Sequence, residues 1–150
     1  MENILYAKAA IQILKPIEVV YEAIVDPERM NMYFIESGTG RLDAEKTVQW
    51  KFPEFEDIFP VEGKICQPYD YISFDWNMGD GENLVEIFLE KISLTATVVR
   101  VKEGKFSNNT EGIKQALGQT EGWANFLASL KAYLEYDVNL RKGAFDFLKQ

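Results

Sequence analysis

Apolar and polar residues alternate along most of the first two thirds of the chain, which predicts β-strands with one buried face. The alternation is clear over residues 4–14, 46–52, 61–65, 71–78 and 84–92, and residues 94–102 are rich in Thr and Val. Turn-forming residues at 79–83 and 103–105 follow two of these stretches, which indicates reversals of the chain. Residues 53–60 are interpreted as a crossing between strands. This order predicts an antiparallel sheet of about seven strands, with Val61, Gly63 and Ile65 among its inward positions.

Two short helices are predicted directly after the first strand. Residues 17–25 place Val20, Tyr21 and Ile24 on one side of a helix. Asp26 and Pro27 follow, and these residue types favour an N-cap and a first helical position. A second short helix is therefore expected over residues 28–34.

The last third of the chain contains the longest helical pattern. Trp123, Leu127, Leu130 and Leu134 fall at i, i+4, i+7 and i+11, which makes one apolar stripe. The pattern predicts a helix over residues 120–141 that Gly143 ends, preceded by a helical region from residues 108–110 with a break at Gly118. A helix of this length spans about 30 Å, enough to cover a sheet. The chain is therefore predicted to be one α+β domain over residues 1–150.

Composition excludes several classes of partner. The net charge of the 150 residues is −8, and Lys and Arg are scattered without a basic stripe. Nucleic acids and anionic membrane surfaces are therefore not expected as partners, because their binding relies on clustered basic residues. The sequence shows no apolar run of eighteen residues and no signal pattern, and it has a single cysteine, Cys66. These features favour a cytoplasmic protein without membrane insertion.

The sequence contains no histidine. This removes Ser-His-Asp and Cys-His nucleophile pairs and most zinc sites, so neither a metal nor another cofactor is expected. Cys66 has no basic neighbour on its predicted strand and is interpreted as a buried structural thiol rather than a nucleophile. The chain is accordingly not expected to be an enzyme.

Several short motifs resemble those of a known family. Residues 20–28 read Val-Tyr-Glu-Ala-Ile-Val-Asp-Pro-Glu, which resembles the V-W-x-A-L-T-D-P-E signature of START-like (SRPBCC) domains, specifically the homologues of the Hsp90 ATPase activator (AHSA-like proteins). Gly122-Trp123 with the leucines behind it, residues 62–65 and residues 74–76 are similar to later motifs of that family. The resemblance covers nearly the whole chain, although Tyr21 stands where Trp is commoner and residues 53–60 depart from the pattern.

The resemblance implies a helix-grip fold. In this fold a curved antiparallel sheet wraps around a long C-terminal helix, and an apolar cavity lies between them. Members of the superfamily often bind lipids, sterols, polyketides or other hydrophobic compounds, and some are cyclases. The order of elements derived from the hydrophobic pattern agrees with this fold.

The main functional hypothesis is a binding module for a hydrophobic small molecule, without chemistry. Aromatic and aliphatic side chains from the predicted inner faces would line the cavity, and residues of the second short helix would close its mouth. Tyr133 and the indole N–H groups would supply polar contacts. The expected ligand-binding residues are Met32, Phe34, Trp50, Phe52, Phe74, Trp76, Trp123, Phe126, Leu127 and Leu130.

Two alternatives remain open. A cyclase-like or hydrolase-like enzyme without histidine would rely on Asp, Glu, Tyr or Lys for acid–base work. A protein-interaction module, including one that regulates a chaperone ATPase, would use Phe55, Ile58 and Phe59, which lie in an acidic segment bounded by prolines. The same three residues would otherwise form the rim of the cavity. The expected state is a monomer or a homodimer.

Overall fold

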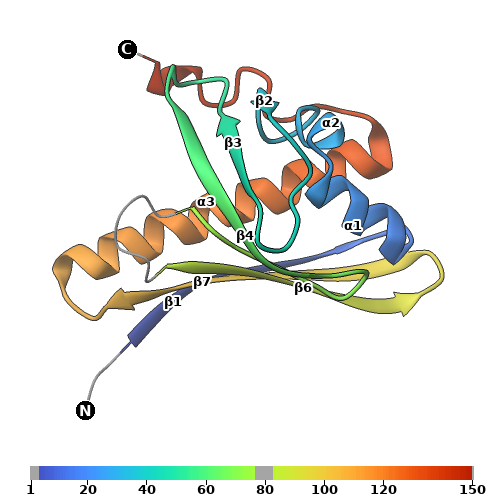
Figure 1. Cartoon of the computed structure of the whole chain (residues 1–150), viewed down its shortest axis with the longest axis horizontal. Coiled ribbons are helices and arrows are strands. Elements are labelled where there is room, and N and C mark those ends of the chain that lie inside the picture. Colours follow the sequence, from blue (N-terminus) through green and yellow to red (C-terminus); the bar gives the residue numbers. More distant parts are fainter. Residues whose placement is uncertain (1–3, 77–82, 150) are drawn as a thin grey trace.

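The computed structural model describes residues 4–76 and 83–149, which form one antiparallel sheet, a long helix and several short helices (Figure 1). The strand order in the described residues is β1-β7-β6-β5-β4-β3-β2. The strands are β1 (Ile4–Ile13), β2 (Ser37–Gly38), β3 (Thr47–Lys51), β4 (Ile58–Gln67), β5 (Tyr71–Asp75), β6 (Leu84–Ser93) and β7 (Ala96–Ser107). The helices are α1 (Ile17–Val25), α2 (Pro27–Met30), α3 (Thr110–Tyr136) and the 3-10 helix η1 (Asp146–Leu148). This architecture confirms the predicted α+β class, with a long helix lying across one face of a curved sheet.

The two short helices follow β1 as predicted. Asp26 caps α2, because its Oδ1 accepts a hydrogen bond of 2.9 Å from the backbone N–H of Glu28, and Pro27 occupies the first turn. The second helix is shorter than expected: it ends at Met30, and residues 31–34 continue as turns.

The long helix α3 differs from its prediction at both ends. It begins after Asn109, whose side chain accepts a hydrogen bond of 2.8 Å from the N–H of Gly112, and it runs through Gly118 without a break. Gly118 is exposed, and a glycine in a helix costs only about 1 kcal/mol, which packing of α3 on β1 and β7 offsets. The helix ends at Tyr136, and the C-cap residue Asp137 adopts a left-handed conformation with φ of 54°. The predicted end near residues 141–143 was wrong, because hydrophobic spacing alone does not show where a chain turns left-handed.

The predicted turn at residues 103–105 was also wrong. Strand β7 continues through these residues, and Glu103 pairs with Val85 of β6 and Ala7 of β1. Because both neighbouring strands supply backbone partners there, the ladder overrides the turn preference of the sequence Glu-Gly-Lys. The other predicted turn, at residues 79–83, and the end of the predicted strand at Met78 lie largely outside the described residues.

A bulge in β4 changes which residues face inward. The register of β4 against β5 shifts between Gly63 and Ile65, so Ile65, predicted to be inward, is 49% exposed. The side-chain oxygen of Ser73 accepts a hydrogen bond of 3.1 Å from the N–H of Ile65, which satisfies the displaced backbone. A Cβ at Gly63 would lie 1.9 Å from the carbonyl oxygen of Asp43, so only glycine fits this close approach.

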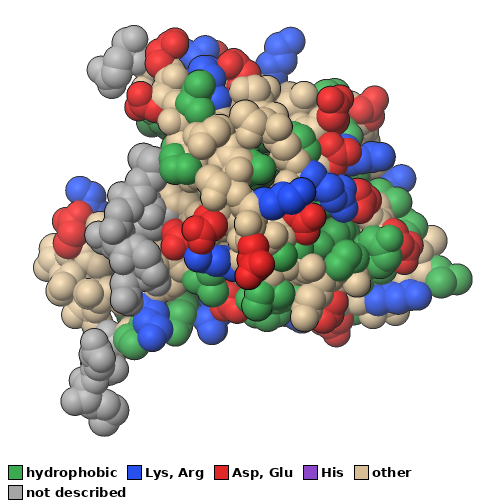
Figure 2. All heavy atoms as spheres, viewed as in Figure 1, with side chains coloured by type: hydrophobic (Ala, Val, Ile, Leu, Met, Phe, Trp, Pro, Cys, Tyr) green, Lys and Arg blue, Asp and Glu red, His purple; other side chains and the backbone are tan. Residues whose placement is uncertain are grey.

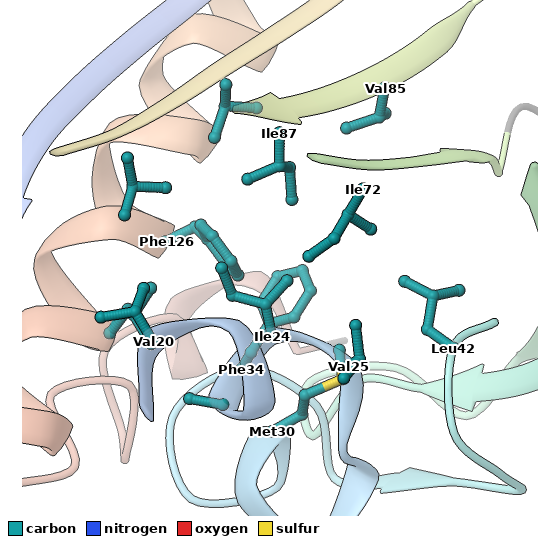
Figure 3. Close-up of a cluster of buried hydrophobic side chains, with 14 of the residues drawn as sticks. Val20, Ile24, Val25, Met30, Phe34, Leu42, Ile72, Val85, Ile87 and Phe126 are labelled. Atoms are coloured by element: carbon teal, nitrogen blue, oxygen red, sulfur yellow. The ribbon is translucent and has the colours of Figure 1, made fainter. Parts of the chain in front are cut away.

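The main core lies between the sheet and the helices (Figure 3). Val20 and Ile24 of α1 and Phe126 of α3 point toward Ile72 and Ile87 on the sheet. On the face shown in Figure 2, Lys and Arg are interspersed with Asp and Glu rather than gathered in one basic patch.

Candidate functional site

Ten aromatic side chains form a continuous set of ring contacts between the sheet and α3. Residues two positions apart lie on the same face of a strand. Trp50 and Phe52 at the end of β3, and Phe74 and Trp76 at the end of β5, therefore point to the same side of the sheet, although Phe52 and Trp76 lie one residue beyond their strands. Helix α3 and the segment after α2 supply rings from the opposite side. This aromatic cluster consists of Tyr33, Phe34, Trp50, Phe52, Phe59, Phe74, Trp76, Trp123, Phe126 and Tyr133.

Phe34 lies at the centre of the aromatic cluster. Its ring centroid is 4.7 Å from that of Phe126, 5.2 Å from that of Phe52 and 5.7 Å from that of Trp50. It is also 6.3 Å from the ring of Trp123. Residue 34 belongs to a turn and not to a strand or helix, so a movement of Phe34 does not require a strand or helix to move.

The side chains around Phe34 leave only a narrow gap between them. It has no room for a water molecule in this conformation, because the rings fill it. A ligand can therefore enter only if one or more of these side chains move. The residues lining the space are Ile24, Met30, Phe34, Trp50, Phe74, Ile87, Trp123 and Phe126.

The structure brings together five of the ten residues expected to bind a ligand, namely Phe34, Trp50, Phe74, Trp123 and Phe126. Phe52 and Trp76 are half-buried members of the aromatic cluster that do not line the space. Leu127 and Leu130 are fully buried in the core beyond it. Met32 is 44% exposed, whereas Met30 is buried and lines the space.

A buried carboxylate, Glu103, lies beside the aromatic cluster, and the sequence interpretation missed it. Its Oε1 accepts hydrogen bonds of 2.8 Å from Trp123 Nε1 and 2.8 Å from Gln119 Nε2. Its Oε2 accepts one of 3.0 Å from Trp76 Nε1. Val99 and Val101 precede it at alternate positions, so extending the predicted strand over residues 94–102 by one residue would have placed Glu103 inward.

The predicted polar groups of the site have different environments. Glu103 already accepts the indole N–H groups of Trp76 and Trp123, whereas the buried indole N–H of Trp50 has no acceptor among the described residues. Tyr133 stacks on Tyr33 with the ring centroids 5.6 Å apart. Burial raises the pKa of Tyr33 well above its ordinary value, and its hydroxyl donates to the carbonyl oxygen of Ala23 at 2.8 Å.

The segment after α3, residues 137–149, contacts the aromatic cluster through Arg141. Arg141 Nη2 lies 2.7 Å from Glu54 Oε1, and the side chain of Glu54 is only 2% exposed. The guanidinium carbon of Arg141 lies 4.9 Å from the ring centre of Phe52 and 5.7 Å from that of Phe34. We call residues 137–149 the C-terminal segment; the hydrophobic pattern carried no signal for this contact.

The acidic segment before β4 has a mixed environment. Phe55 is 45% exposed and Ile58 is 65% exposed. Phe59 instead packs against Phe52, with the ring centroids 5.3 Å apart. Of the three residues proposed for a protein-binding patch, two are therefore at the surface and the third belongs to the aromatic cluster.

The described residues hold little that resembles catalytic chemistry. Cys66 is half-buried, and burial raises the pKa of its thiol to about 11, so it is a weak nucleophile at neutral pH. No group of three or more Cys, Asp and Glu side chains within residues 4–76 and 83–149 could hold a metal ion. In the same ranges, no helix is both long and apolar enough to cross a membrane.

Comparisons with known proteins point to one family. The family model described as "Activator of Hsp90 ATPase homolog 1-like protein" matches residues 15–135. The structure is similar to that of protein SSP2350 from Staphylococcus saprophyticus, with 31% sequence identity, a TM-score of 0.80, and coverage of 91% of this chain and 96% of that one. Among curated proteins, none matches the chain.

Two further solved structures share the fold at lower identity. The Aha1 dimer from Colwellia psychrerythraea is 18% identical with a TM-score of 0.74, over 88% of this chain and 97% of that one. DynU16, a protein of the dynemicin biosynthetic locus, is 23% identical with a TM-score of 0.74, over 88% of this chain and 48% of that one.

Proposed function

The chain belongs to the family of Activator of Hsp90 ATPase homolog 1-like proteins, and from this premise we propose that it is a binding module for a hydrophobic small molecule. The ligand would lie between the sheet and α3, at the space around Phe34. The protein would bind this molecule without converting it.

The observation that carries the proposal is the convergence of large apolar side chains from separate elements on one space. Small-molecule sites are typically apolar, with few polar groups that fix the orientation of the ligand. Phe34 from a turn, Trp50 from β3, Phe74 from β5 and Trp123 from α3 meet at this space, and Trp50 adds an indole N–H without an acceptor among the described residues. An apolar ligand that displaces Phe34 would replace ring contacts by ring contacts and so lose little packing energy.

The side chains of this protein support the proposal that it binds its ligand without catalysing a reaction. The sequence has no histidine, and the raised pKa of Cys66 makes it a poor nucleophile. Glu103 accepts hydrogen bonds from three donors, which fix the position of its carboxyl group.

The test uses the tryptophans as reporters. The chain has three tryptophans, and all three belong to the aromatic cluster, so their indole N–H signals in a ¹H–¹⁵N spectrum report on the site directly. A panel of apolar compounds, from fatty acids to polycyclic aromatics, should shift the Trp50 and Trp123 signals in a saturable way.

Two aromatic substitutions sharpen this test. Phe34→Ala should enlarge the space and strengthen binding of bulkier compounds, whereas Phe88→Ala, which removes a ring that is 39% exposed on β6, should leave binding unchanged. If the panel moves none of the three indole signals in the wild type or in Phe34→Ala, the proposed function is wrong.

A second candidate function is protein binding, which the exposure of Phe55 and Ile58 favours. If these side chains form an interface, the wild type should elute in gel filtration with a larger mass than one chain, or retain a chaperone in a pull-down. The double variant Phe55→Ser and Ile58→Ser should abolish that association while leaving the indole spectrum unchanged. A monomeric wild type that retains no partner would remove this candidate.

A further inference from the structure

Glu103 is a buried carboxyl group that no cation of the described residues pairs with. The residue is 2% exposed, and none of the ion pairs formed within residues 4–76 and 83–149 includes it. Its three described partners, Trp76, Gln119 and Trp123, are neutral. A buried charge is costly unless it is paired, so this carboxylate favours a cationic partner from outside the described chain.

The hydrogen bonding of Glu103 leaves room for such a partner. An ionised carboxylate offers about four acceptor positions, two on each oxygen. Oε1 accepts from Trp123 and Gln119 and is fully used, whereas Oε2 accepts only from Trp76 among the described residues. Trp76, the donor to Oε2, is itself half-buried.

The two indole rings beside Glu103 also suit a cation. The ring centroids of Trp76 and Trp123 are 5.2 Å apart with 30° between their planes. Both rings direct their N–H edges to the carboxylate, and their faces pack against other rings of the aromatic cluster, so a cation would reach a face by displacing one of those rings. Tryptophan faces attract cations more strongly than other aromatic faces do, so a positive group at Oε2 would be stabilised by the carboxylate and by the rings together.

We propose that the hydrophobic ligand of this protein is an amine, whose protonated nitrogen donates a hydrogen bond to Glu103 Oε2 while its apolar body lies in the aromatic cluster. This inference rests on the proposed function, because it names the ligand class of the same site. It assigns Glu103 as the residue that selects between amines and neutral molecules of the same shape.

Three probes of matched shape test the inference: naphthylmethylamine, naphthylmethanol and methylnaphthalene, titrated at neutral pH and followed by the indole N–H signals. The amine should bind the wild type at least about tenfold more tightly than methylnaphthalene, as a charge-assisted hydrogen bond in a buried site implies. The alcohol, a neutral donor, should fall between the two.

The variant Glu103→Gln removes the charge and keeps the shape. It should lose the preference for the amine while binding methylnaphthalene within about twofold of the wild type. Glu90→Gln is the matched control, because Glu90 is an exposed residue of β6 that pairs with Arg100; it should keep the full amine preference. If Glu103→Gln fails to fold, Gln119→Leu replaces it, and the loss of one donor to Oε1 should raise the amine preference.

The outcomes separate this inference from the proposed function. If methylnaphthalene binds the wild type and the amine binds no more tightly, the ligand class is wrong and the binding function stands. An amine preference that persists in Glu103→Gln also overturns the inference. If none of the probes or of the wider apolar panel binds, the binding function itself fails, and the inference fails with it.

Discussion

The ion pair between Glu54 and Arg141 is predicted to contribute strongly to the free energy of unfolding. It joins two segments that are 87 residues apart in sequence and holds the C-terminal segment on Phe52 and Phe34. The side chain of Glu54 is 2% exposed and that of Arg141 is 17% exposed. The perturbation is Arg141→Met, which keeps much of the apolar volume and removes the charge.

The expected cost follows from burial. Removing one partner of a buried ion pair typically costs about 3–5 kcal/mol, because the remaining charge is left without compensation. Loss of the cation–π contacts with the rings adds about 0.5–1 kcal/mol. Opening of the C-terminal segment, which would let water reach Glu54, sets an upper limit on the loss. We therefore expect Arg141→Met to lower the free energy of unfolding by about 3 kcal/mol.

The double variant distinguishes a buried pair from simple packing. Glu54→Leu together with Arg141→Met removes both charges, and such replacements are often close to neutral. The double variant should therefore be more stable than Arg141→Met alone, with a coupling energy of about 2 kcal/mol in the double-mutant cycle.

Urea unfolding followed by tryptophan fluorescence measures these values. The matched control is Arg41→Met, which breaks an exposed pair with Glu22, where the side chains are 46% and 36% exposed; it should cost at most about 1 kcal/mol. The reasoning is refuted if Arg141→Met costs no more than Arg41→Met, or if the two single effects simply add.

Three further predictions follow from individual contacts. Trp123→Ala, at a buried ring bonded to Glu103, should cost about 3–5 kcal/mol in urea unfolding; a loss below 1 kcal/mol would contradict its core position. Gly63→Ala places a Cβ 1.9 Å from the Asp43 carbonyl oxygen and should lower the melting temperature, whereas Gly118→Ala, where the Cβ meets open space, should raise it slightly. Burial raises the pKa of the Cys66 thiol from 9.0 to about 11, so the folded state retains this proton more tightly than the unfolded chain. The stability that the protonated Cys66 thiol contributes is full below pH 9 and is lost as the pH rises toward 11. Across this range the urea midpoint of the wild type should therefore fall more steeply with pH than that of Cys66→Ala. Equal slopes for the two proteins would contradict this raised pKa.

The hydrophobic pattern predicted most of the strands and helices, because the pattern within one element depends only on residues that are close together in sequence. Alternation along a strand and the helical period depend on neighbouring residues, so β1, α1 and β3 appear close to where the pattern places them. The capping role of Asp26 was predicted for the same reason. The errors occur where a distant partner decides: β7 continues through residues 103–105 because β1 and β6 pair with it, and the bulge at Gly63 exists because β5 and Asp43 approach it.

The candidate site divides in the same way. The sequence by itself determined which aromatic residues face inward, since Trp50, Phe74 and Trp123 follow from strand alternation and the helix stripe, and it determined that no histidine takes part. Only the tertiary structure decided what these rings meet. Glu103 is hydrogen-bonded to Gln119, Trp123 and Trp76, which lie 16, 20 and 27 positions away in the sequence. Glu54 pairs with Arg141 across 87 residues. The burial of these carboxylates depends on long-range packing that no short stretch of sequence encodes.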